Sequence, residues 1–142
     1  MADQFLILTA IGDDRPGLVG ELSAAISAHQ GNWLESSMSR LAGKFAGIVK
    51  VAVPDGNANA LKTALAGLSG LKVTAEISAD GKSAVAGRRL KLSLIGHDRI
   101  GIVREVSQVL ARHAVNVEEL STHTASAPMS AEIMFHASID LL

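Results

Sequence analysis

The chain has 142 residues, of which 48% are hydrophobic and 19% are charged, and its formal net charge is −1. This composition excludes an intrinsically disordered chain, and the balanced charge argues against direct binding of nucleic acid, which needs a clustered excess of Lys and Arg. The absence of cysteine excludes disulfide scaffolds, thiolate zinc sites and cysteine nucleophiles. No apolar run approaches the ~20 residues that span a bilayer, and the N-terminus lacks signal-peptide features. We therefore expect a cytoplasmic protein.

A repeat with an offset of 84 residues organises the sequence. Ile11–Asn32 aligns without a gap on Ile95–Asn116, and ten of the 22 pairs are identical. This similarity predicts two copies of one smaller unit. Because the intervening segment is rich in turn-forming residues, we predict a first unit at residues 1–79, a linker at residues 80–89 and a second unit at residues 90–142.

Hydrophobic periodicity predicts six elements in the first unit, in the order strand, helix, strand, strand, helix, strand. They are a strand at Gln4–Ile11, a helix that starts within residues 13–17 and ends at Gly31, strands at Leu34–Ala42 and Phe45–Val53 around a Gly43-Lys44 turn, a helix capped by Asn57, and a strand at Leu71–Ile77. This order is typical of the split-βαβ, or ferredoxin-like, α+β fold, in which two helices pack on one face of an antiparallel sheet.

The second unit follows the same plan without completing it. Its predicted elements are a strand at Leu90–Ile95, a helix at Arg99–His113, and strands at Val115–Thr124 and Ala131–Asp140. The second helix and fourth strand have no counterpart, so one sheet edge is left without a neighbour and part of one face stays bare. Either the chain is shortened or another chain covers this surface, and we expect a homodimer with a two-fold interface.

Catalytic and metal-binding motifs are missing from the sequence. Gly81-Lys82-Ser83 lacks the preceding glycine of a phosphate-binding loop, and no nucleophile elbow or dinucleotide fingerprint occurs. The five histidines show no paired ligand spacing; they are His29, His97, His113, His123 and His136. We interpret His29 and His113 as helix C-terminal residues and Trp33 as a packing residue. The sequence thus predicts no enzymatic activity, no metal and no cofactor.

A duplicated loop is the one candidate binding feature. Residues 12–17 and 96–101 each join a strand to the N-terminus of a helix, where unpaired backbone N–H groups and the helix dipole suit a small carboxylate. An aspartate in the loop and the amide of Asn32 or Asn116 offer acceptors for an ammonium group. Aspartate at a helix start is also a common N-cap, and glycine marks turns generally. The residues alone leave both interpretations open.

The D-R-P-G-L-V start of the first unit, which reads D-R-I-G-I-V in the second, and the Asn that follows the first helix resemble the ACT domain, a small ligand-binding regulatory module. The resemblance covers both units and implies that an amino acid binds at the interface between paired units. The ligand-binding positions that it implies are Gly12, Asp14, Asn32, Gly96, Asp98 and Asn116. Many amino-acid-binding members carry Asn where Asp14 and Asp98 stand. His97 replaces Asp13 and Ile100 replaces Pro16, so the two sites need not be equivalent.

Two ACT-like units without an attached enzyme are similar to the family of glycine cleavage system transcriptional repressors. This resemblance implies a non-catalytic regulator that binds a small amino acid, with glycine as the leading candidate. The regulator would act on a protein partner such as a DNA-binding transcription regulator. One alternative is a detached regulatory region of an enzyme such as formyltetrahydrofolate deformylase, although that enzyme would carry a single ACT unit. Another is an oligomerisation module without a ligand.

Overall fold

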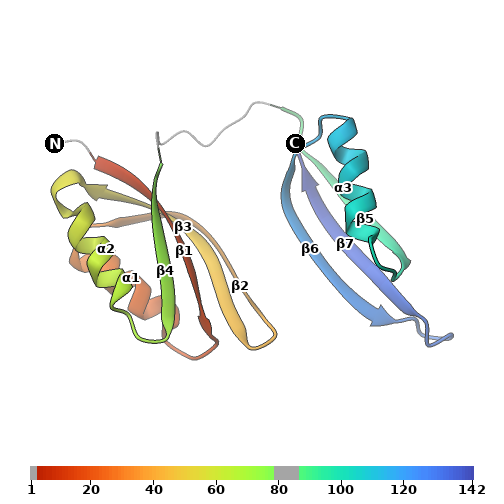
Figure 1. The fold of residues 1–142 in the computed structure, drawn as a ribbon, viewed down its shortest axis with the longest axis horizontal. Helices are drawn as coiled ribbons and strands as arrows, with labels where there is room; N and C mark the ends of the chain where they lie inside the picture. The colour runs from red at the N-terminus through yellow and green to blue at the C-terminus, as the bar shows by residue number, and fades with distance from the viewer. Residues whose placement is uncertain (1–2, 79–86) are drawn as a thin grey trace. The chain divides into compact units, whose positions relative to one another are not determined.

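The computed structural model describes residues 3–78 and 87–142, which belong to two compact units (Figure 1). Most of the predicted linker, residues 80–89, lies outside the described residues, as does Gly81-Lys82-Ser83, so the bounds of the linker stay a prediction. Each unit is described below by itself.

The first unit contains a four-stranded antiparallel sheet with the strand order β2-β3-β1-β4 and two helices against one face (Figure 1). Its elements are β1 (Asp3–Asp13), α1 (Leu18–Ala28), β2 (Asn32–Leu41), β3 (Lys44–Pro54), a 3₁₀ turn η1 (Asp55–Asn57), α2 (Ala58–Ala66) and β4 (Leu71–Ser78). The predicted βαββαβ order is therefore confirmed.

Alternating residues of the strands form the core of the first unit. Leu6, Leu8 and Ala10 of β1 point toward the helices and are buried, as the predicted period of two requires. On the helix side, α1 contributes residues four apart, Leu18, Leu22 and Ile26, and all three are also buried. Trp33 packs against this core, which confirms its predicted packing role; further core positions are Val49, Val51, Val53, Leu61 and Leu65.

One local prediction for the first unit is wrong and another is confirmed only in position. The β2–β3 turn residues are Ala42 and Gly43, not Gly43 and Lys44, because Leu41 pairs directly with Lys44. Both turn residues have positive φ, 52° and 78°, as the right-handed twist of a two-residue hairpin favours. Asn57 is the N-cap residue of α2, as predicted, but its side chain does not cap the helix. Its amide instead donates to the carbonyl oxygen of His29 at 2.9 Å and so links the two helices.

The second unit has a three-stranded antiparallel sheet with the order β5-β7-β6 and one helix. Its elements are β5 (Leu90–His97), α3 (Ile102–Arg112), β6 (Val117–Ser126) and β7 (Ile133–Leu141). The observed ends differ from the predicted ones by up to three residues, most clearly for α3, which begins at Ile102 instead of Arg99. The fold is thus two α+β ferredoxin-like units, the second without a second helix or fourth strand among its described residues.

The repeat extends to the backbone geometry. A register shift interrupts the pairing of β2 between Trp33 and Glu35, and the same shift occurs 84 residues later between Val117 and Glu119 of β6. The strand-to-helix loops are held alike, since the Asp14 N–H donates to the Gly43 carbonyl at 3.0 Å and the Asp98 N–H donates to the Ile133 carbonyl at 3.0 Å. The two units therefore share one backbone plan down to an irregularity in one strand.

Candidate functional site

The duplicated loops end at equivalent glycines. Gly17 and Gly101 precede α1 and α3 with φ of 91° and 88°, a left-handed conformation that favours glycine. Neither helix has a side-chain cap, so the N-cap interpretation of Asp14 and Asp98 is wrong for this structure. In α3 the first N–H, that of Ile102, donates to the Arg99 carbonyl at 3.4 Å, so the two helix N-termini are not identical.

In the first unit the carboxylate of Asp14 lies beside the start of α1. Arg40 of β2 donates to it from Nη1 at 3.3 Å, and the side chain of Asp14 is partly buried. A shallow depression adjoins this carboxylate; its lining residues are Asp14, Arg15, Gly17, Leu18, Val19, Gly20 and Phe45. Thr124 occupies the position of Arg40 in the second unit, and Asp98 has no ion pair within the described ranges.

An arginine in each loop pairs with a glutamate in the first turn of the following helix. Arg15 Nη2 lies 2.6 Å from Glu21 Oε2, and Arg99 contacts Glu105 through two nitrogens, one at 2.8 Å. The hydrogen bonds between Arg99 and Glu105 raise the pKa of the guanidinium and lower the pKa of the carboxyl. Sequence reasoning missed these pairs, although the identical spacing of six residues in both repeats could have indicated them.

The residues before these arginines differ between the units. Asp13 accepts a hydrogen bond from Lys44, which holds the pKa of that carboxyl below its ordinary value of 3.8. At the equivalent place His97 lies 3.3 Å from Glu132. The two loops therefore carry different charged residues, as the substitution of His97 for Asp13 predicts.

Gly12 has a structural reason to be glycine. A Cβ atom at this position would collide with the carbonyl oxygen of Gly70, in the turn between α2 and β4. The Arg15 side chain contacts the same turn, because its Nη2 donates a hydrogen bond to the Ser69 carbonyl at 3.2 Å. For Gly96 the nearest atom to an added Cβ is Ile102 Cδ1 at 3.8 Å, an ordinary contact. Packing thus explains Gly12 without a ligand, whereas it does not explain Gly96.

The two asparagines lie far from the loops of their own units. Asn32 pairs with Ala52 of β3, whereas Gly12 pairs with Phe45, so seven residues of strand, about 23 Å at 3.3 Å per residue, separate them. Asn116 likewise exchanges backbone hydrogen bonds with Leu142 at the far end of the sheet from Gly96. Each unit brings the predicted glycine and aspartate together and places the asparagine at the opposite end.

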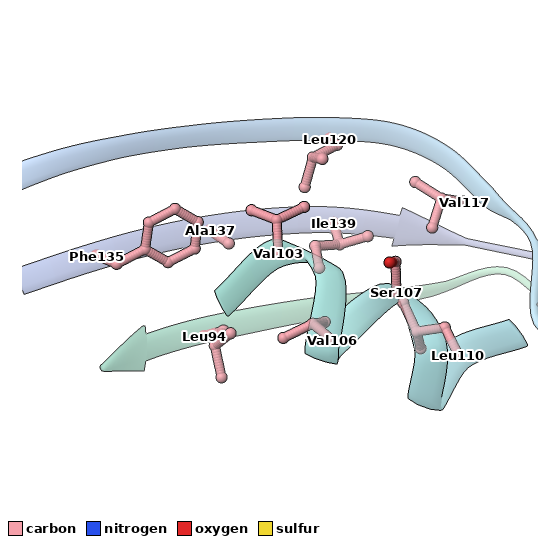
Figure 2. Close-up of a pocket in the computed structure, with 10 residues that line it drawn as sticks. All are labelled: Leu94, Val103, Val106, Ser107, Leu110, Val117, Leu120, Phe135, Ala137 and Ile139. Atoms are coloured by element: carbon pink, nitrogen blue, oxygen red, sulfur yellow. The ribbon is translucent and has the colours of Figure 1, made fainter. Parts of the chain in front are cut away.

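The second unit also has a groove between α3 and the sheet, in which the lining side chains converge from the helix and all three strands (Figure 2). Nine of its ten lining residues are apolar, and Ser107 supplies the one side-chain oxygen; the residues are Leu94, Val103, Val106, Ser107, Leu110, Val117, Leu120, Phe135, Ala137 and Ile139. Such a lining provides no partner for the charged ends of an amino acid, so the loops remain the candidate site.

Among the other predicted positions, His29 fits its expected role, because its Nδ1 lies 2.9 Å from the carbonyl oxygen of Ala25 near the end of α1.

No helix in the described residues has the length and apolar character to cross a membrane. The same residues contain no group of three or more His, Asp or Glu side chains placed to hold a metal ion.

A small antiparallel sheet with helices on one face, repeated within one chain and bearing a glycine-containing loop before the first helix of each unit, defines a ferredoxin-like α+β module. Residues 4–77 match the ACT domain family, and the chain belongs to that family. No curated protein matches the chain.

Solved structures extend the likeness to both units. A protein of unknown function from Galdieria sulphuraria is 30% identical, with a TM-score of 0.85 over 98% of this chain and 81% of that one. A protein assigned as a glycine cleavage system transcriptional repressor is 20% identical, with a TM-score of 0.77 over 99% of this chain and 81% of that one. The tandem ACT fold is therefore shared by both proteins over almost the whole length of this chain.

Proposed function

We propose that this protein is a non-catalytic, cytoplasmic regulator that binds a small amino acid, with glycine as the leading candidate. It would act on a protein partner such as a DNA-binding transcription regulator. The observation that carries the proposal is the duplicated loop, in which an aspartate that does not cap the helix stands close to the helix N-terminus. Membership of the ACT family and the fold shared with a protein assigned as a glycine cleavage repressor support the regulatory role.

The loop and the asparagine of one unit cannot serve the same ligand. Because Asn32 lies about 23 Å of strand away from Gly12, no small amino acid reaches both within one unit. An amino acid whose carboxylate bound at the helix N-terminus would have its ammonium group near Asp14 or Asp98. Any asparagine ligand would have to come from outside that unit. The ion pair of Asp14 with Arg40 makes the two loops unequal, so we expect tighter binding of an ammonium group at Asp98.

Calorimetric titration with the common amino acids tests this proposal. We expect saturable binding of glycine that is lost in Asp98→Ala and weakened in Asp14→Ala. Asp55→Ala, a substitution of an exposed aspartate in η1, is the matched control and should leave binding unchanged. Absence of heat with every amino acid would favour the ligand-free oligomerisation module.

Control of a protein partner is tested by copurification in the presence and absence of the bound amino acid. With 13 basic and 14 acidic residues, the protein has no excess positive charge with which to hold DNA by counterion release. We therefore expect no gel shift with the protein alone and a glycine-dependent change in partner recovery. A salt-sensitive gel shift at sub-micromolar protein would contradict this part of the proposal.

We further propose that the protein is a homodimer in which β5 edges pair across a two-fold axis. The Asp98 N–H donates to Ile133 of β7, and backbone groups alternate sides along a strand, so the alternate residues Lys91, Ser93 and Ile95 direct their N–H and C=O groups to the open edge of β5. Antiparallel pairing centred on Ser93 would place Leu92 opposite Leu94 of the second copy and cover apolar surface.

Proline scanning of the two sheet edges tests this interface. Ser93→Pro removes an outward N–H of β5 without touching the β5–β7 ladder, and it should convert a dimer into a 14.7 kDa monomer in light scattering. Thr122→Pro makes the same change on the outer side of β6 and should leave the dimer intact. A wild-type monomer at micromolar concentration, or a dimer unaffected by Ser93→Pro, would refute the pairing.

A further inference from the structure

Two histidines meet on the face of the second sheet opposite α3. His123 of β6 and His136 of β7 are directly opposed in the antiparallel register. Their rings stack with centroids 4.7 Å apart and planes 1° from parallel. The neighbours Phe135 and Ala137 are buried against the helix side, so His136 projects from the other face, and His123 is exposed.

Small polar side chains surround the two rings. The adjoining row across the sheet consists of Ser93, Ser138 and Ser121, paired strand to strand, and these serines line a shallow depression together with the two imidazoles and Ile95. The serines leave room above the sheet next to the rings. No third His, Asp or Glu joins them within the described parts of the chain.

We propose that His123 and His136 form a two-imidazole site for a late first-row divalent cation, with Cu²⁺ the tightest. Imidazole nitrogen is a strong ligand for these ions, and Cu²⁺ heads the affinity order for nitrogen ligands. The torsion that orients a histidine ring is broad, so both rings can turn a nitrogen toward one ion from their fixed strand positions. Water would complete the coordination, since the protein supplies two ligands.

The site is particular to the second unit. By the strand register its two positions correspond to Ser39 of β2 and Ala46 of β3 in the first unit, which are opposed in the same way. Ile11 and Ile95 are equivalent on the neighbouring strand, so the surroundings are otherwise alike. The site is also distinct from the proposed amino-acid loops.

Titration with the Cu²⁺–iminodiacetate chelate provides a direct test. The chelator leaves two adjacent coordination positions, which one exposed histidine cannot fill but an opposed pair can. Electron paramagnetic resonance should count two bound imidazoles in the wild-type protein. His123→Ala and His136→Ala should each reduce the count to one and weaken binding at least about tenfold, because the second ligand acts at high effective concentration.

Two further variants separate the pair from other histidines and from folding defects. His97→Ala removes another exposed histidine of the same unit and should change neither the count nor the affinity. Introducing Ser39→His and Ala46→His into the His123→Ala/His136→Ala background should restore the two-imidazole spectrum from the first unit. One imidazole in the wild-type spectrum, or equal binding by wild type and His123→Ala, would overturn the proposal. Glycine titration of His123→Ala should match that of the wild type.

Discussion

Leu6 of β1 and Leu90 of β5 occupy equivalent positions in the two units, 84 residues apart. Each strand pairs with the last strand of the hairpin in its own sheet, β3 for β1 and β7 for β5. Leu6 is 0% exposed and Leu90 is 49% exposed. The difference follows from α2 and β4, which cover β1 in the first unit and have no counterpart among the described residues of the second. Similar local sequence therefore produces the same backbone plan, whereas burial depends on elements that lie elsewhere in the chain.

The comparison continues along the helices. Leu18, Leu22 and Ile26 of α1 are buried, but their equivalents Ile102, Val106 and Leu110 of α3 are only partly buried. Since hydrophobic stabilisation scales with the apolar area removed from water, the second unit should gain less from side chains of similar size. We expect it to be the less stable unit, and residue-resolved hydrogen exchange can measure each unit separately.

Truncation of equivalent core leucines should have the largest effect. Leu8→Ala empties a fully buried position and should destabilise the first unit by about 3 kcal/mol. Leu92→Ala acts at a half-buried position and should cost the second unit about 1 kcal/mol. Hydrogen exchange of the slowest amides in each unit provides the measurement. Equal losses would mean that another surface covers β5 as fully as α2 and β4 cover β1.

Alanine at the two loop glycines should sharpen the contrast. Gly12→Ala places a Cβ against the Gly70 carbonyl and should destabilise the first unit by about 2 kcal/mol, because backbone must move. Gly96→Ala meets only ordinary contacts and should leave the stability of the second unit unchanged. Thermal unfolding of both variants tests this difference. If Gly96→Ala leaves stability intact but weakens glycine binding, Gly96 serves the ligand.

Replacing the loop arginines should have a smaller effect. Arg15→Gln breaks the ion pair with Glu21 and the hydrogen bond to Ser69, which holds the turn before β4, and should cost about 1 kcal/mol. Arg99→Gln removes only an exposed ion pair and should cost little. Faster hydrogen exchange in β4 is the specific signature expected for Arg15→Gln. Similar behaviour of both variants would assign the effect to the ion pair alone.

The smallest expected effect is a change in the pKa of one carboxyl group, that of Asp13. Met134 pairs with His97 in the second unit as Lys44 pairs with Asp13 in the first, so Lys44→Met introduces the equivalent residue. The substitution should raise the pKa of Asp13 back to about its ordinary value of 3.8. Because this pKa is lowered in the folded protein, the pair stabilises above the ordinary pKa, and its contribution is lost as the pH falls through the folded-state value. Carboxyl NMR titration measures the shift. An unchanged pKa would show that Lys44 does not hold the carboxyl.

Much of the fold follows from local patterns in the sequence. The alternation of Leu6, Leu8 and Ala10 identifies a strand and its buried face, and the spacing of Leu18, Leu22 and Ile26 identifies a helix and its buried stripe. The repeat then predicts the second unit from the first. Element ends are less predictable, as the Ala42-Gly43 turn shows, because two neighbouring residue pairs both suit a tight turn and strand pairing selects between them.

Contacts between distant residues could not be read from the sequence. The histidines showed no ligand spacing, yet β-strand register stacks His123 on His136, and no local pattern encodes that alignment. The loop composition suggested a helix cap for Asp14, whereas the tertiary structure supplies Arg40 as its partner and places Asn32 at the far end of the sheet. Local propensity and periodicity thus determined which segments form strands and helices, because those depend on neighbours a few residues away. Strand pairing and packing decided which side chains meet, because those contacts join residues that are remote in the chain.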